Sequence, residues 1–155
     1  MTKMRKRLGI LLVLSMLFFT IEPSLGFSLV LITPEEALQP EVPLLRGVEC
    51  TRLEGDGPQI KITSPKLDGP LRTPLAIDIV FEAASNKIID YDSLRLKYLR
   101  LISIDLTDRV KPYLKNNRLM VRDVKVPQGR HCLQLLIAYT SGEQTLIEIF
   151  LNVIM

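Results

Sequence analysis

The chain has 155 residues, a formal net charge of +3 and no tryptophan. Four of the 20 basic residues and one of the 17 acidic residues lie within residues 1–26, so 16 of each remain in residues 27–155. This neutral remainder lacks the broad basic field of a nucleic-acid-binding protein, and its length suffices for one domain with one core.

Residues 1–26 have the pattern of an export signal. Four basic residues precede an apolar run from Leu8 to Ile21, and Ser24-Leu25-Gly26 forms a small-residue cleavage site. The run is shorter than the roughly 20 residues of a membrane-spanning helix and is followed by Glu22 and Pro23. We expect cleavage after Gly26 and a mature chain in the periplasm or at the cell surface. The alternative is an uncleaved signal that anchors the chain in the membrane.

Residues 27–58 are expected to form a short helix followed by an extended arm. Thr33, Pro34 and Glu36 have the spacing of a capping box with proline at the first helical position. From Gln39 to Pro58, proline and glycine recur with little periodicity, which predicts an extended arm. The globular domain is therefore expected to comprise residues 59–155.

Several runs within residues 59–155 alternate between apolar and polar side chains, as half-buried strands do. The first strands are predicted at residues 59–64, 75–82, 93–101 and 118–126. The last of these contains a bulge near Arg122-Asp123. Residues 104–114 break the alternation, and they predict a short helical crossover between two sheets.

Residues 127–153 predict a β-hairpin whose turn is Ser141-Gly142. Alternate positions from His131 to Tyr139 and from Ile147 to Val153 give each run one face to bury. An isolated hairpin is marginally stable in water, so these faces need a second sheet. The expected fold is therefore all-β, an antiparallel β-sandwich of about seven strands.

Three segments carry a resemblance to a known family: residues 89–96 (IDYDSLRL), residues 104–107 (IDLT) and residues 127–131 (PQGRH). Together they resemble bacterial extracellular immunoglobulin-like and fibronectin type III-like modules. Those modules have an acidic turn before a Ser-Leu strand, a crossover with Asp and Thr, and a Pro-x-Gly-x-His turn before the penultimate strand. The resemblance covers about residues 59–153 and implies an immunoglobulin-like fold, but no particular activity, because such sandwiches host many functions.

Cys50 and Cys132 are the two cysteines of the chain. Outside the cytoplasm they are candidates for a disulfide that ties the arm to the first hairpin strand. Two unpaired thiols are the alternative, because spacing in the sequence does not place two Cα atoms within bonding distance.

His131 is the only histidine and hence the obvious candidate for catalysis or metal binding. The simpler interpretation is a turn residue that bonds a nearby backbone group, since no partner base or nucleophile accompanies it. Five acidic residues are candidate calcium ligands: Asp90, Asp92, Asp105, Asp108 and Asp123. They lack the spacing of an EF-hand, and turn capping explains them equally well. We therefore predict no catalytic residue, cofactor or metal site.

Arg95, Lys97 and Arg100 are predicted to form a basic binding face on one sheet, with Arg118 and Arg122 beside them. A solvated outer face balanced by acids across the strands is the alternative. On the outer face of the hairpin, three apolar residues need a cover, which we expect the arm to supply. These residues are Leu136, Leu146 and Phe150.

These features predict an exported, non-enzymatic binding or structural module of the bacterial cell envelope. Such a module would present loops or a strand edge to a protein partner and would bind no nucleic acid. The alternative is a carbohydrate- or anion-binding module that uses the basic face around Arg95 and Lys97. A small hydrolase with His131 in its site is a third hypothesis.

Overall fold

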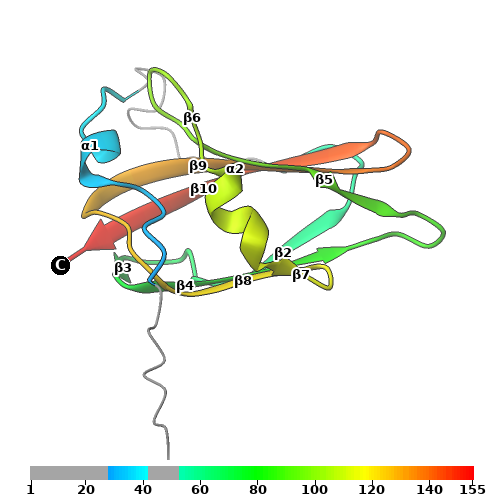
Figure 1. Ribbon diagram of the computed structural model, residues 1–155, viewed down its shortest axis with the longest axis horizontal. Helices are drawn as coiled ribbons and strands as arrows, with labels where there is room; N and C mark the ends of the chain where they lie inside the picture. The colour runs from blue at the N-terminus through cyan, green and yellow to red at the C-terminus, as the bar shows by residue number, and fades with distance from the viewer. Residues whose placement is uncertain (1–27, 42–52) are drawn as a thin grey trace, which may run out of the picture.

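The computed structural model describes residues 28–41 and 53–155, which form a two-layer β-sandwich (Figure 1). The predicted export signal and Cys50 lie outside the described residues. The prediction of an all-β sandwich built from two largely antiparallel sheets is confirmed. Within the described part of the chain, no helix combines the length and the apolar character needed to span a membrane.

The first sheet has the strand order β1-β10-β9-β5-β6, with β3 pairing to β10 in parallel. Its strands are β1 (Leu53–Glu54), β3 (Leu71–Arg72), β5 (Ile89–Tyr98), β6 (Ile104–Asp105), β9 (Gly129–Tyr139) and β10 (Gln144–Ile154). The predicted hairpin is confirmed as β9 and β10, whose register runs from the Ala138–Gln144 pair to the Gly129–Val153 pair. This hairpin forms the centre of the first sheet.

The second sheet has the strand order β2-β4-β8-β7. Its strands are β2 (Gln59–Ser64), β4 (Leu75–Glu82), β7 (Leu114–Lys115) and β8 (Arg118–Val124). The predicted bulge is confirmed, because Leu75 and Ile77 of β4 pair with Val124 and Val121 of β8, which leaves one extra residue in β8. Asp123 in this bulge has a positive φ of 55°, a conformation that short polar residues tolerate.

Two short helices flank the sandwich. In α1 (Pro34–Ala37) the predicted capping box is confirmed, with Glu36 N donating to Thr33 Oγ1 at 3.2 Å and Thr33 N donating to Glu36 Oε2 at 2.8 Å. Helix α2 (Thr107–Val110) and the 3-10 helix η2 (Lys111–Tyr113) lead from β6 in the first sheet to β7 in the second. This is the predicted crossover.

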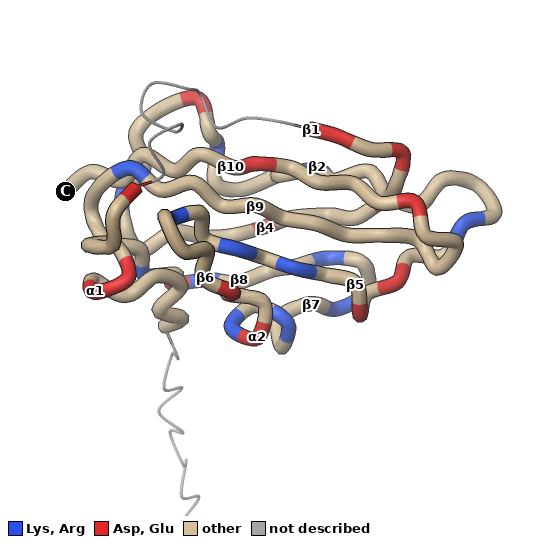
Figure 2. Tube along the Cα trace, turned by 90° about the horizontal axis from the view of Figure 1, so that it is seen from above, with Lys and Arg blue, Asp and Glu red and all other residues tan. Residues whose placement is uncertain are grey.

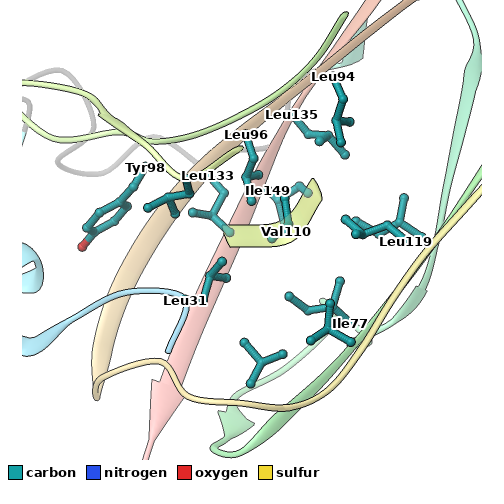
Figure 3. Close-up of a cluster of buried hydrophobic side chains, with 14 of the residues drawn as sticks. Leu31, Ile77, Leu94, Leu96, Tyr98, Val110, Leu119, Leu133, Leu135 and Ile149 are labelled. Carbon is teal, nitrogen blue, oxygen red and sulfur yellow. The ribbon is translucent and has the colours of Figure 1, made fainter. Parts of the chain in front are cut away.

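The core lies between the sheets and includes residues from the N-terminal segment (Figure 3). Leu31 and Ile32 are at most 1% exposed, although the predicted domain boundary at residue 59 places both outside the sandwich. Leu31 N donates to Lys125 O at 3.0 Å, and Lys125 N donates to Leu29 O at 2.7 Å. These bonds hold the segment along the residues that follow β8, so that its side chains point into the core.

Candidate functional site

His131 belongs to a buried polar network at the start of β9. Its side chain is 2% exposed, and its Nε2 lies 2.8 Å from Pro127 O. Its Nδ1 lies 2.8 Å from the hydroxyl of Tyr98, which is itself completely buried. Arg100 completes the network, because its Nε donates to the Tyr98 hydroxyl at 2.5 Å. Both ring nitrogens of His131 are therefore engaged in structural hydrogen bonds.

Burial lowers the pKa of His131, and the nearby Arg100 charge lowers it further. The hydrogen bond to Pro127 O and the carboxylate of Glu41 act in the opposite direction. Burial also raises the pKa of Tyr98, so its hydroxyl keeps its proton at neutral pH. The network thus contains a neutral imidazole and a neutral phenol beside one guanidinium.

Arg100 does not share an exposed face with the other two residues of the predicted basic face. It is 4% exposed, its guanidinium lies 4.6 Å from the Tyr98 ring centroid, and its Nη1 lies 3.2 Å from Glu41 Oε1. Strand β5 ends at Tyr98, but Leu99 N still donates to Cys132 O of β9. Arg100 follows Tyr98 by two residues, so the period of two that buries Leu94, Leu96 and Tyr98 also turns Arg100 inward.

Arg95 and Lys97 are exposed on β5, as expected. Arg95 donates to the carbonyls of Asp92 and Leu94, both at 2.7 Å, and Lys97 lies opposite Asp105 in the sheet register.

Arg118 and Arg122 are on β8, in the other sheet, so the expectation that they lie beside β5 is wrong. Arg118 there forms two hydrogen bonds with Asp78, at 2.6 and 2.5 Å. The tube view shows basic and acidic positions interspersed along these elements (Figure 2).

The acidic residues act as caps and ion-pair partners. Asp90 accepts from the backbone of Asp92, Asp105 accepts from the backbone of Thr107, and Asp92 pairs with Lys111 at 2.9 Å. Within residues 28–41 and 53–155, no cluster of three or more metal-ligating side chains occurs. The hydrogen bonds of Asp90 and Asp105 to nearby backbone groups match the turn-capping interpretation.

Cys132 on β9 is disulfide-bonded. The other cysteine of the chain, Cys50, lies outside the described residues. The pairing of Cys50 with Cys132 stays a prediction.

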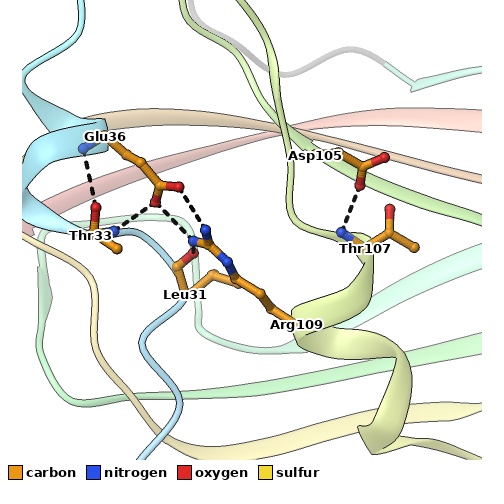
Figure 4. Close-up of polar contacts among 6 residues, drawn as sticks. All are labelled: Leu31, Thr33, Glu36, Asp105, Thr107 and Arg109. Atoms are coloured by element: carbon orange, nitrogen blue, oxygen red, sulfur yellow. Dashed lines mark hydrogen bonds and ion pairs between the residues drawn. The ribbon is translucent and has the colours of Figure 1, made fainter.

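An ion pair between α1 and α2 fastens the N-terminal segment to the sandwich (Figure 4). Arg109 donates to both carboxylate oxygens of Glu36, at 2.8 and 2.6 Å, and to Leu31 O at 2.7 Å. The hydrogen bond from Arg109 holds the pKa of Glu36 below its usual range. The sequence contains no local signal for this contact, because 73 residues separate the two partners.

Three exposed aliphatic residues belong to two segments, the one that follows α1 and the loop before β6, and Figure 1 shows both segments at one end of the sandwich. Leu38 is 85% exposed, Leu101 is 62% exposed and Ile102 is 76% exposed. The two segments are joined by a hydrogen bond from Leu101 N to Pro40 O at 3.0 Å. We call Leu38, Leu101 and Ile102 the end surface. The sequence pattern does not single it out, because Leu101 is the last residue of the strand predicted at residues 93–101 and Ile102 directly follows it.

The outer face of the hairpin is only partly buried. Leu136, Leu146 and Phe150 have intermediate exposure, and the guanidinium of Arg130 lies 5.0 Å from the Phe150 ring centroid. Among residues 28–41, the best-buried side chains, Leu31 and Ile32, pack into the core instead of covering this face. The expected cover is therefore wrong for Leu31, and for residues 42–52 of the arm, which lie outside the described residues, it stays a prediction.

The chain matches no protein-family model, no curated protein and no solved structure in comparisons with known proteins. Its class is therefore defined by the fold alone, as an all-β sandwich with two largely antiparallel sheets.

Proposed function

We propose that this chain is an exported, non-enzymatic binding module of the bacterial cell envelope with an immunoglobulin-like fold. The strand orders support this fold type. The order β2-β4-β8-β7 corresponds to strands A, B, E and D of an immunoglobulin domain, and β10-β9-β5-β6 corresponds to G, F, C and C′. The export signal predicted in residues 1–26 supports the envelope location.

The end surface carries the proposal. Isolated aliphatic residues on a surface are ordinary, but these three lie on two segments joined by a hydrogen bond, and we propose that they act together as one apolar contact area. The sandwich that carries them is fully hydrogen-bonded inside, since no buried side-chain nitrogen or oxygen within the described residues lacks a hydrogen-bond partner. Such an area suits a protein partner that buries apolar side chains of its own.

The buried, hydrogen-bonded position of His131 favours a binding role over hydrolysis. A general base needs a ring nitrogen that can take a proton from a nucleophile or water. In this chain Nε2 bonds Pro127 O and Nδ1 bonds the Tyr98 hydroxyl, and the side chain is 2% exposed. We therefore assign His131 a structural part in the module.

The anion-binding alternative loses support from the position of Arg100. Of its three predicted cations, only Arg95 and Lys97 remain exposed, and Lys97 lies opposite the acidic residue Asp105 in the sheet register. We accordingly propose a protein as the partner.

The test is a pull-down of envelope proteins with the mature chain and two variants. The double substitution Leu101→Ser and Ile102→Ser should reduce capture about tenfold or more, since apolar anchors dominate interface energies. The matched control is Ile88→Ser, which changes a 70% exposed residue in the β4–β5 loop at the other end of the sandwich (Figure 1). Capture by wild type should also persist in high salt. Equal capture by wild type and the double variant would overturn the proposal, as would equal loss with Ile88→Ser.

A further inference from the structure

We propose that His131 is the sensor of a pH-dependent latch, which holds Pro40 and Glu41 against the loop that carries Leu101. The latch itself rests on the hydrogen bonds around His131. Its consequence for binding rests on the proposed function, because Leu38 and Leu101 of the end surface lie on the two segments that the latch joins.

The hydrogen bonds require one proton arrangement when His131 is neutral. Pro127 O can only accept, so Nε2 of His131 carries the proton. Arg100 Nε can only donate, so the Tyr98 oxygen accepts there and its own proton goes to Nδ1 of His131. Every donor and acceptor in this chain of bonds is matched.

Protonation of His131 breaks this match. Nδ1 becomes a donor, so the Tyr98 oxygen faces two donors, and its own proton loses its acceptor. The imidazolium also lies near the guanidinium of Arg100, with both bonded to the same buried oxygen. Burial makes both effects costly, because Tyr98 and His131 are at most 2% exposed.

The other charged groups near the network do not offset this cost. Among residues 28–41 and 53–155, the charged groups that act on His131 and Tyr98 are Arg100, which follows β5, and Glu41 and Glu36 of the N-terminal segment. Glu36 is already engaged by Arg109. Glu41 is paired with Arg100, and its side chain is 46% exposed, so solvent screens its attraction for a second cation.

The contacts of Arg100 and Leu101 are the ones that acidification can break. Tyr98 lies on β5 and His131 lies on β9. These are neighbouring strands of one sheet, and Tyr98 is paired with Leu133 in their register. Arg100 lies beyond the end of β5, and its partner Glu41 is near solvent. Acidification is therefore expected to release Arg100 together with Glu41 and to open the bond from Leu101 N to Pro40 O. The end surface then separates into its two segments.

The latch is tested by NMR on the mature chain between about pH 8 and about pH 5, the range in which histidine titrates. His131 is the only histidine, so its imidazole signal is unambiguous. The second readout is the exchange protection of the Leu101 amide, corrected for intrinsic exchange. In wild type, that protection should decrease about tenfold for each unit by which the pH falls. This dependence holds between the pKa of His131 in the open state and its pKa in the latched state.

Three variants identify the sensor. His131→Gln should abolish the pH dependence of Leu101 protection. Tyr98→Phe should leave His131 titrating but uncouple Leu101 protection from it, and this variant also serves if His131→Gln fails to fold. Glu41→Gln should keep a His131-linked pH dependence, which excludes the Glu41 carboxyl as the sensor. The latch is overturned if Leu101 protection stays constant while wild-type His131 titrates, or if His131→Gln retains the wild-type dependence.

Partner capture separates the latch from the proposed function. If a partner is captured through the end surface, capture by wild type should fall at about pH 5, and capture by His131→Gln should not. If Leu101 protection follows His131 and no partner is captured, the latch stands and the proposed function fails. If capture depends on Leu101 and Ile102 but not on pH, the proposed function stands and the control of binding by the latch fails.

Discussion

Leu31→Ala tests whether the N-terminal segment is part of the fold. Leu31 is completely buried among core residues from both sheets, although it lies 28 residues before the predicted domain boundary at residue 59. Truncating a buried leucine removes its transfer free energy and leaves a cavity, which together cost about 2–5 kcal/mol. We expect this loss in the free energy of unfolding of the mature chain.

Urea denaturation measures the effect. With a slope of about 2 kcal/mol per molar urea, the midpoint should fall by about 1–2.5 M while the slope is unchanged. Leu38→Ala is the matched control, because Leu38 lies in the same segment and is 85% exposed, so its effect should stay within about 0.5 kcal/mol. A Leu31→Ala cost below about 1 kcal/mol would refute the burial of this segment in the core.

Two further predictions concern the attachments of the N-terminal part of the chain. Glu36→Gln should lower the free energy of unfolding by about 1–2 kcal/mol at neutral pH, because it weakens the two hydrogen bonds from Arg109. Arg109 holds the folded-state pKa of Glu36 below 4.5, so this stabilisation is complete above that pH and is lost as the pH falls through the folded-state value. A difference between wild type and Glu36→Gln that persists unchanged in strong acid would contradict this account. Cys50 and Cys132 should resist alkylation in denaturant until a reductant is added, because Cys132 is disulfide-bonded. Alkylation of both cysteines without reductant, or a disulfide-linked dimer on a non-reducing gel, would exclude the intramolecular bridge.

Features set by neighbouring residues were predictable from the sequence. Alternation between apolar and polar side chains located β9 and β10, because the period of two is a property of the strand itself. Thr33 and Glu36 specified their capping box for the same reason, since the two residues bond across three positions of one helix. The bulge at Asp123 was also visible, because the register of apolar positions shifts within one strand.

Features set by distant residues were not predictable. The alternation of β5 places Arg100 on the side of Tyr98, which contradicts its predicted place on the basic face. What the sequence does not show is that Tyr98 and Glu41, from two parts of the chain, both bond its guanidinium there. Leu31 likewise has no strand pattern around it, and its burial follows from bonds to Lys125 and Arg109. Sequence alone gives no rule for these pairings.

The attachments of residues 28–41 explain why the end surface depends on the whole fold. This segment is fixed by Leu31 in the core, by Glu36 on α2 and by Glu41 on Arg100. The first two attachments do not involve His131, so they should persist when the third opens. The exposed end of the segment can then move while the core stays packed. A pH change would therefore alter the surface available to a partner without unfolding the sandwich that supports it.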